Sequence, residues 1–301
     1  MSSLLFFDID NTLWTGREQY VPDSTREAIA AARRRGHLCL INSGRSRSYL
    51  HEPLLYELGF DGIVSSCGMQ IELTQLAGKV KPDWAEIAPD GSIRSLPTPE
   101  MKPVPGPVTE RGADEAVIFY RRMGGDFTEE ALALCAGCGC TPVLEGKEYS
   151  YIDRKAFLDV RYGNLLSSRM GSRLVEIEDH RGDIDITKLT ICMPPGHEGV
   201  IREVFGDRFE CMIHSRTVAE LVPKGFDKGT GIREVCRLLG ADIRDTVAFG
   251  DGANDIGMLD AAGCAVVMGD GAEGAKKHAD LVTAPLLEDG IWKAMRRLEL
   301  I

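Results

Sequence analysis

The stretch Leu4-Leu5-Phe6-Phe7-Asp8-Ile9-Asp10-Asn11-Thr12 decides the fold of this chain. Its apolar run, residues 4–7, has the length and composition of a buried strand in a parallel sheet. Ligands of open α/β sheets bind just beyond the carboxyl ends of such strands, where Asp8 and Asp10 stand here. Two carboxylates so close together repel each other unless a cation holds them. The stretch therefore predicts a strand that ends at a metal site, with a nucleophile among its acidic residues.

Strand-like and helix-like segments alternate in the first third of the chain. A helix is expected over 23–35, with Asp23-Ser24 at its capping position and Gly36 as its stop signal. The other elements expected there are strands over 4–7, 38–41 and 62–64 and a helix over 47–58. Such alternation implies right-handed crossovers in a parallel sheet.

The last third repeats this alternation. Helices are expected over 230–239, 256–262, 273–278 and 291–298, and strands over 246–249, 264–268 and 281–282. Because strands and helices alternate in both outer thirds, we expect an α/β fold in which these thirds form a single sheet domain. The middle of the chain is inserted between them.

The middle third differs in composition from the two outer thirds. Seven of the 14 prolines fall between Pro82 and Pro107, and proline favours extended or loop backbone. The segment 81–114 is therefore expected to be a long excursion and not a packed core element. Helix-like and strand-like segments resume from about residue 127. The predicted organisation is a core of residues 1–122 and 223–301, with a Pro-rich insertion at about 74–115, and a second α/β domain of residues 123–222.

Composition excludes several classes of partner. The 301 residues carry a net charge of −11 and show no long Lys/Arg run, which argues against nucleic acid and against anionic membranes. We see no apolar run long enough for a membrane helix and no signal peptide, so a cytoplasmic location is expected. The nine cysteines are mostly scattered through apolar segments, where they are expected to be small buried hydrophobes.

A second acidic cluster follows another expected strand, in Gly250-Asp251-Gly252-Ala253-Asn254-Asp255. Its glycines let the backbone approach a bound ion or phosphate closely. Carboxylate oxygens with no nearby histidine suit Mg²⁺. Capping of a helix by Asp251 or Asn254 would explain one residue of this run but not the whole.

Two further polar residues would complete a site for a phosphorylated ligand. Lys228, shortly before the expected helix over 230–239, supplies a positive charge that the acidic clusters lack, and Lys224 is the alternative lysine. Ser43, at the end of the strand over 38–41, has a hydroxyl that can donate to a phosphoryl oxygen.

Together these residues carry a resemblance to a known family. The segments Asp8-Ile9-Asp10-Asn11-Thr12, Ser43-Gly44-Arg45, Lys228-Gly229 and Gly250–Asp255 resemble the four motifs of the haloacid dehalogenase-like superfamily of hydrolases, and more closely its Cof-type phosphatases. The approach Glu220-Leu221-Val222-Pro223-Lys224-Gly225 and the 23-residue step from Lys228 to Asp251 are similar to that branch, which favours Lys228 over Lys224. The resemblance covers about residues 4–72 and 217–293.

The resemblance implies a Rossmann-like parallel sheet core with an α/β cap domain inserted after the third strand. Ser43 stands where the branch usually has Thr, which keeps the hydroxyl. The larger departure is the Pro-rich insertion, because the branch crosses from residues like 70–72 into the cap through a short hairpin. Here the matching second strand is expected only at Val117–Tyr120.

The resemblance also implies roles. Asp8 would attack phosphorus and form an aspartyl-phosphate, while Asp10 would act as general acid and base. Mg²⁺ would be held by Asp8, the backbone carbonyl of Asp10 and Asp251, with Asp255 taking part directly or through water. Residues expected to bind substrate are Ser43, Gly44, Arg45, Lys228 and Asn254. The implied substrate is a small phosphorylated metabolite, such as a sugar or polyol phosphate.

Alternatives stay open at this point. A phosphotransferase or phosphomutase would pass the phosphoryl group to an acceptor other than water, and a receiver-like signalling module would keep it on the aspartate. The CxxC core of Cys135-Ala136-Gly137-Cys138-Gly139-Cys140 fits zinc or redox chemistry, although the sequence has no second CxxC or CxxH pair. Its simpler interpretation is the end of a helix that glycines stop.

Overall fold

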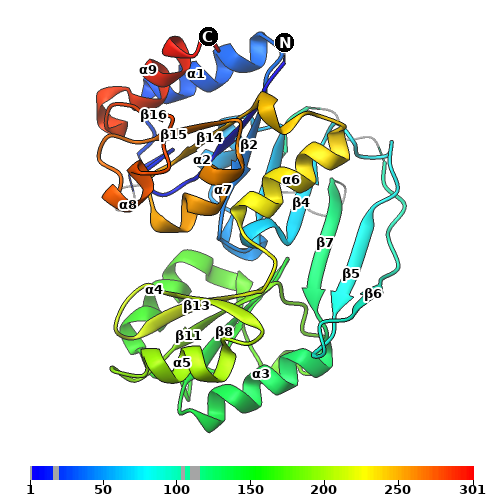
Figure 1. The fold of residues 1–301 in the computed structure, drawn as a ribbon. Helices are drawn as coiled ribbons and strands as arrows, with labels where there is room; N and C mark the ends of the chain where they lie inside the picture. The colour runs from blue at the N-terminus through cyan, green and yellow to red at the C-terminus, as the bar shows by residue number, and fades with distance from the viewer. Residues whose placement is uncertain (1, 16–19, 103–105, 109–115) are drawn as a thin grey trace.

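The chain folds into two sheets with helices packed against them, as Figure 1 shows. This computed structural model describes residues 2–15, 20–102, 106–108 and 116–301. In order across the sheet, the strands of the larger one are β16 (Leu281–Val282), β15 (Cys264–Val267), β14 (Thr246–Gly250), β1 (Leu4–Phe7), β2 (Leu38–Asn42), β3 (Gly62–Ser65), β4 (Gln70–Leu73), β7 (Val117–Met123), β5 (Asp83–Ile87) and β6 (Ile93–Ser95). Those of the smaller sheet are β10 (Leu174–Glu176), β9 (Ser150–Ile152), β8 (Thr141–Glu145), β11 (Lys188–Cys192), β13 (Val218–Pro223) and β12 (Phe209–Ile213).

Helices cover both sheets. They are α1 (Asp23–Arg34), α2 (Pro53–Glu57), α3 (Gly125–Gly137), α4 (Val160–Met170), α5 (Glu198–Phe205), α6 (Lys228–Leu239), α7 (Ile256–Ala261), α8 (Glu273–Lys276) and α9 (Gly290–Arg297). Short 3₁₀ turns include η1 (Arg47–Tyr49), η2 (Ser66–Gly68) and η6 (Ala253–Asp255). Neighbouring strands from β16 to β3 are parallel, so the outer thirds of the chain share one sheet, as the sequence predicts.

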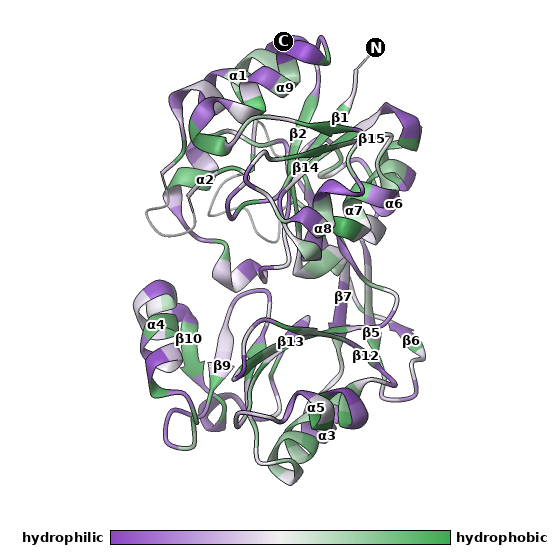
Figure 2. Cartoon of the chain, turned by 60° about the vertical axis from the view of Figure 1, so that its left-hand side comes forward, coloured by the Kyte–Doolittle hydropathy of each residue, from purple (hydrophilic) through white to green (hydrophobic). Residues whose placement is uncertain are grey.

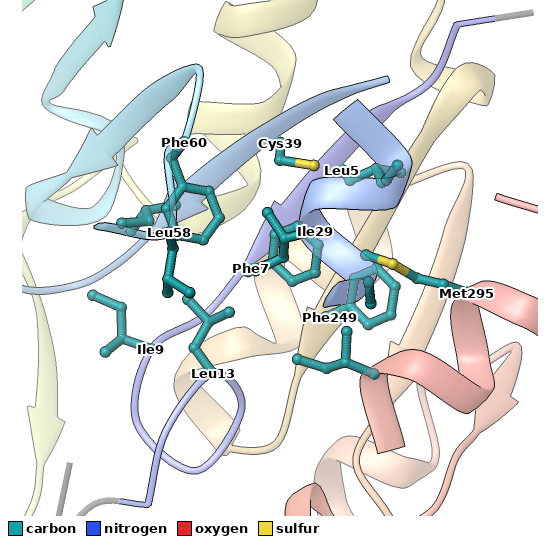
Figure 3. Close-up of a cluster of buried hydrophobic side chains, with 14 of the residues drawn as sticks. Leu5, Phe7, Ile9, Leu13, Ile29, Cys39, Leu58, Phe60, Phe249 and Met295 are labelled. Carbon is teal, nitrogen blue, oxygen red and sulfur yellow. The ribbon is translucent and has the colours of Figure 1, made fainter. Parts of the chain in front are cut away.

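The central strand β1 is buried on both faces. Leu5 and Phe7 pack in a cluster with α1 and α9, whereas Leu4 and Phe6 pack with α6 and α7. Phe7 also stacks on Phe249 of β14 with ring centroids 4.7 Å apart, and Figure 3 shows Met295 of α9 beside Phe249 at one side of this cluster. Burying each such side chain contributes roughly 1.5–3 kcal/mol, so β1 is fixed firmly in the middle of a three-layer structure.

Hydropathy follows the same arrangement. Figure 2 shows β1, β2, β14 and β15 as mostly hydrophobic, while the helices around them carry both hydrophobic and hydrophilic residues. Continuous apolar strands and amphipathic helices are typical of a parallel sheet that is covered on both faces. Among the residues that the structure describes, no helix has the length and apolar character that crossing a membrane requires.

Two local predictions for the first third were wrong. The segment 47–58 is not one helix: it forms η1 and the short α2, because Pro53 begins α2 and holds the preceding Glu52 in extended backbone. Helix α1 does begin at Asp23, but the residue at its capping position is Pro22 and no side chain caps it. Asp23 instead lies in the first turn, where its charge suits the helix dipole.

The expectation that segment 81–114 lacks packed elements was also wrong. Strand β5 pairs in parallel with β7, and β6 closes a hairpin on β5 at the edge of the large sheet. Pro82 lies directly before β5 and Pro89 beyond its end, so no proline interrupts the strand. Ala85 and Ile87 are buried, and the Trp84 indole donates to the carbonyl of Val117 at 2.9 Å.

The smaller sheet belongs to the segment between β7 and α6, which we call the cap. Strand β7 pairs antiparallel with β4, as expected for the strand that leads into it. The chain enters the cap at Gly124 and returns through residues 224–227. Strand β7 ends at Met123 and β13 at Pro223, and the domain boundaries at 122/123 and 222/223 stay a prediction.

A buried ion pair fixes the segment that follows β2. Arg47 of η1 is 1% exposed and donates from Nε to Oε1 of Glu72 on β4 at 2.6 Å, with Glu72 fully buried. The same guanidinium donates to the carbonyl of Leu50 and to the hydroxyl of Tyr56. Because charges are costly to bury unless they are paired, this contact commits η1 to one position beside the ends of the central strands.

We expect Arg47→Met to lower the free energy of unfolding by about 3–5 kcal/mol, because it removes the buried guanidinium that pairs with the buried Glu72 carboxylate. Urea denaturation measures this loss. The matched control is Arg237→Met, which removes the exposed pair with Glu234 on α6 and should cost no more than about 0.5 kcal/mol. Equal losses in the two variants would contradict the assignment of Arg47 as a structural anchor.

Candidate active site

Four segments distant in sequence meet at the carboxyl ends of the central strands. Strand β1 lies between β2 and β14, so Asp8, Ser43 and Asp251, which follow these strands, come to one edge of the sheet. Lys228 joins them from the first turn of α6, where a reciprocal capping box of Asp227 and Thr230 sets the start of the helix. The last residue of β2, Asn42, also holds Lys228 by donating to its backbone carbonyl at 2.9 Å.

Three carboxylates and one ammonium form the centre of this site. Asp8, Asp251 and Asp255 each place a carboxylate oxygen within 4.8 Å of the others. The Lys228 Nζ donates to Asp8 Oδ1 at 2.5 Å and to Asp255 Oδ1 at 2.6 Å, and its side chain is fully buried. The convergence that the sequence predicts for Asp8, Lys228 and Asp251 is therefore present, whereas Lys224 lies on the linker after β13.

Burial and the crowding of negative charge shift the pKa values of these groups. Burial and the nearby charge of Asp255 raise the pKa of Asp8 to about 7, against the opposing effect of Lys228. Burial and Asp255 likewise raise the pKa of Asp251 to about 6. Burial alone would lower the pKa of Lys228, but Asp255 and Asp8 raise it, so this lysine stays charged. One ammonium thus leaves the three carboxylates under-compensated.

Asp255 organises the cluster from behind. Its Oδ2 accepts hydrogen bonds from the backbone N–H groups of Asp251 and Gly252, both at 2.9 Å, while its Oδ1 accepts from Lys228. A methyl group on Gly250 would lie 2.8 Å from the Asp255 side chain, so the loop can close only around glycine. With both oxygens engaged, Asp255 is better placed to hold the loop and Lys228 than to bind an ion directly.

The donor set fits a hard divalent cation such as Mg²⁺. Carboxylate oxygens of Asp8 and Asp251 lie within 4.8 Å of each other, no histidine or cysteine is part of the group, and three carboxylates share the single ammonium of Lys228 there. The Asp251 carboxylate is oriented by the hydroxyl of Thr12, which donates to it at 3.1 Å. The Asp10 carboxylate is not part of this group, so a role for Asp10 through its backbone carbonyl stays a prediction.

Asp10 lies on the cavity side of the cluster. Its carboxylate accepts from Arg45 at 2.8 and 3.1 Å and from the indole N–H of Trp14 at 3.1 Å, and 44% of its side chain is exposed. Arg45 is also paired with Glu52 at 2.9 Å. Asp10 is therefore held by groups that fix its position while leaving it accessible to a ligand.

The remaining site residues line one cavity of about 570 Å³ between the core and the cap. The core residues that line it are Asp8, Asp10, Asn11, Ser43, Gly44, Arg45, Tyr49, Cys67, Asp251 and Asn254. Ser43 is buried beside the cluster, and its Oγ accepts from the backbone N–H of Arg45 at 3.1 Å. Every residue that the sequence predicts for substrate binding thus lies at this cavity, except the fully buried Lys228 behind it.

Sequence reasoning missed the cap wall of the cavity. That wall consists of Tyr162, Arg169, His214, Ser215, Val218 and Glu220. His214 also lines the cavity, with its Nε2 3.4 Å from Oε2 of Glu220. These side chains come from separate elements of the cap and are not spaced regularly in the sequence. Only Glu220 was noted, because it belongs to the segment 220–225 that resembles the stretch before the family's lysine motif.

Lys188 is a further site residue that the sequence analysis did not identify. This buried cap lysine donates to the backbone carbonyl of Gly44 at 2.9 Å and pairs with Glu220 at 2.8 Å and Glu145 at 3.7 Å. A side chain at Gly44 would begin 3.3 Å from Glu220 Oε1, so cap and core meet closely at this loop. The contact places the cap directly on the loop that carries Ser43.

The cysteine cluster lies at the C-terminal end of a cap helix. Cys135 lies on α3, which ends at Gly137. Among the described residues, the carboxylates of Asp8, Asp251 and Asp255 are the one group of three or more potential metal ligands. Cys135 and Cys140 line a separate cavity of about 710 Å³ in the cap, and burial raises the pKa of Cys140 to about 12. Protonated thiols are poor nucleophiles and poor ligands, so the interpretation as a glycine-stopped helix end describes this segment better.

This fold and site define an enzyme of a known class. A model of the haloacid dehalogenase-like hydrolase family matches residues 5–81 and 104–295, so the chain belongs to this family. A solved structure described as the sugar phosphatase BT4131 of the superfamily's subclass IIB superposes with a TM-score of 0.73 at 25% identity and covers 100% of both chains. These findings agree with the Cof-type branch that the sequence predicts.

Two curated relatives come from Bacillus subtilis strain 168. One, named "Putative phosphatase YkrA", is 30% identical over 303 residues, which cover 100% of this chain and 99% of the relative. The other, 5-amino-6-(5-phospho-D-ribitylamino)uracil phosphatase YitU, is 30% identical over 135 residues, 42% of this chain and 50% of the relative.

The contact between Lys188 and Glu220 predicts a pH dependence of stability. Burial raises the pKa of Glu220, but Lys188 and His214 outweigh it and lower the pKa from 4.5 to about 2. A carboxylate with a depressed folded-state pKa stabilises the fold above its unfolded value and loses this contribution as the pH falls toward 2. We therefore expect Glu220→Gln to cost on the order of 2–3 kcal/mol above pH 5 and progressively less below pH 4.5.

Urea denaturation of wild type and Glu220→Gln between pH 2.5 and 7 would measure this difference. Glu203→Gln, at an exposed position on α5, is the control and should change stability little at any pH. A cost for Glu220→Gln that stays constant over this range would show that its charge is not responsible.

Proposed function

We propose that this enzyme is a Mg²⁺-dependent phosphatase that hydrolyses a small phosphorylated metabolite through an aspartyl-phosphate on Asp8. The observation that carries the proposal is the convergence of Asp8, Asp251 and Lys228 at the floor of a cavity that the cap closes. Such a floor neutralises a phosphoryl dianion and presents one carboxylate oxygen to it. Membership of the family and the phosphatase names of the relatives support the same reaction.

Asp8 is the proposed nucleophile. It directly follows the buried central strand β1, and Lys228 donates to its Oδ1. An oxygen held this way attacks phosphorus in line with the leaving group, so one difficult displacement becomes two easier ones. Lys228 and the hydroxyl of Ser43 then bind the equatorial phosphoryl oxygens, where charge is spread in the loose transition state.

Asp10 is the proposed general acid and base. It is accessible from the cavity and lies two residues after the nucleophile. We infer that it protonates the leaving oxygen and then accepts a proton from the water that cleaves the aspartyl-phosphate. The ion pair with Arg45 orients its carboxyl group, and rearrangement of that pair on substrate binding would release it for proton transfer.

When Mg²⁺ is bound, it supplies the positive charge that the three carboxylates lack and offsets the charge of the phosphoryl group. Asp8 and Asp251 would hold it, with the backbone carbonyl of Asp10 as a further ligand. Asp255 keeps its place behind them through the backbone N–H groups of Asp251 and Gly252.

The cavity supports a sugar or polyol phosphate as substrate. A volume of about 570 Å³ accommodates a metabolite of that size. The cap wall presents hydroxyl, guanidinium and carboxylate groups from Tyr162, Arg169 and Glu220, which suit the many hydroxyls of such a molecule. Two similar proteins, a sugar phosphatase and a phosphoribitylamino-uracil phosphatase by name, support the same substrate class.

We expect Asp8→Asn to lower the release of inorganic phosphate from p-nitrophenyl phosphate by on the order of 10³-fold or more, because the amide cannot form the covalent intermediate. Its thermal midpoint should equal or exceed that of wild type, since the substitution removes one of three crowded carboxylates. A phosphate-release assay and a melting curve test both points. Residual activity above about a tenth of wild type would refute the nucleophile assignment.

Removal of Mg²⁺ with a chelator should abolish phosphate release, and added Mg²⁺ should restore it. Because a ligand that binds only the folded state stabilises it, Mg²⁺ should also raise the thermal midpoint of wild type. Asp251→Asn is the control, in which this shift should largely disappear. An unchanged rate in excess chelator, or an equal thermal shift in both proteins, would argue against the proposed ion site.

A further inference from the structure

Part of the Pro-rich insertion lies outside the match to the family model. The family match runs over residues 5–81 and resumes at 104, so it skips 82–103. That skipped segment contains the hairpin of β5 and β6, which lengthens the large sheet beyond β7. Figure 1 shows the hairpin at the edge of the sheet, running alongside β7 toward the cap. The proposed chemistry gives this hairpin no role.

The hairpin reaches the two linkers that join cap to core. The cap can move relative to the core only if the backbone changes at Gly124 or within residues 224–227, because these are the two places where the chain passes between them. Any element that contacts both linkers therefore affects the position of the cap over the cavity.

Contacts with the first linker are polar. The carbonyl of Ile87 accepts from the backbone N–H of Gly124 at 3.1 Å, which continues the pairing of β5 with β7 beyond the strand end. Glu86 pairs with Arg122 at 3.0 Å. A methyl group on Gly124 would lie 2.7 Å from the Glu86 carboxyl group, so the two elements are in close contact.

Contacts with the second linker are apolar. Ile87 is 8% exposed and belongs to a cluster with Cys67, Met69 and Val222, against which Phe226 packs. The turn of the hairpin, residues 88–91, lines a cavity of about 370 Å³ together with Pro223 and Phe226. The side chain of Ile87 thus packs between the core segment that contains Cys67, the last cap strand β13 and the linker of residues 224–227.

We propose that the hairpin of residues 83–95 is a brace for the cap, with Ile87 and Glu86 as its positioning residues. The brace stabilises the arrangement in which Lys188 contacts Gly44 and the cap covers the cavity. It acts through the linkers and touches no reacting group. Its effect on turnover rests on the proposed phosphatase function, whereas its effect on the linkers does not.

Hydrogen exchange of the free protein tests the brace without reference to activity. Ile87→Ala removes the apolar contact, so the amides of Gly124 and of residues 224–227 should exchange at least about ten-fold faster, while those of β1 and β14 keep their protection. Ile93→Ala is the matched control: the same substitution on the same hairpin, at a side chain that is 62% exposed. It should leave the linker amides unchanged.

Steady-state kinetics with p-nitrophenyl phosphate extends the test. Glu86→Gln keeps the shape of the side chain but removes its ion pair, so KM should rise about three-fold or more with little change in kcat, and Glu86→Asp should restore part of the loss. Wild-type linker exchange in Ile87→Ala, or equal acceleration of every amide, would overturn the brace. Absence of phosphate release from wild type would refute the proposed function instead and leave the exchange result valid.

Discussion

The placement of one buried ammonium between two carboxylates governs the rest of the site. Lys228 contacts Asp8 and Asp255, so it links the first strand of the sheet to the loop after β14 and to the start of α6. An unpaired lysine could not remain charged at this depth, and three unpaired carboxylates could not remain together. The buried Lys228 ammonium and the three carboxylates therefore stabilise one another in their charged forms. The arrangement leaves an excess of negative charge, which a divalent cation can balance.

The central sheet and the catalytic floor were predictable because their signals are local. Apolar strands followed at once by acidic or hydroxyl residues define an edge, and parallel pairing brings the ends of β1, β2 and β14 together. The cap wall was not predictable, because Arg169, His214 and Glu220 become neighbours only after the cap has folded. Lys188 had no signal at all, since a buried lysine and a surface lysine look alike in sequence.

Prolines were the source of two wrong predictions, a strand that was missed and a helix that was predicted too long. A high proline content suggested an unstructured excursion, but Pro82 and Pro89 flank β5 and leave its backbone free to pair with β7. A single proline, Pro53, was overlooked within the expected helix over 47–58 and divides it. In both cases the position of the ring relative to the required N–H groups mattered, and the number of prolines did not.

The short strand at the end of the large sheet has a consequence for self-association. Strand β6 spans three residues, all exposed, and among the described parts of the chain it pairs with β5 alone, so its outer side presents backbone groups that no described strand pairs with. An exposed edge of this kind can template a strand from another molecule. Here the edge is brief, carries the charge of Arg94 and is followed by Pro97, which cannot donate to a ladder. The insertion thus lengthens the sheet while leaving little for a foreign strand to pair with.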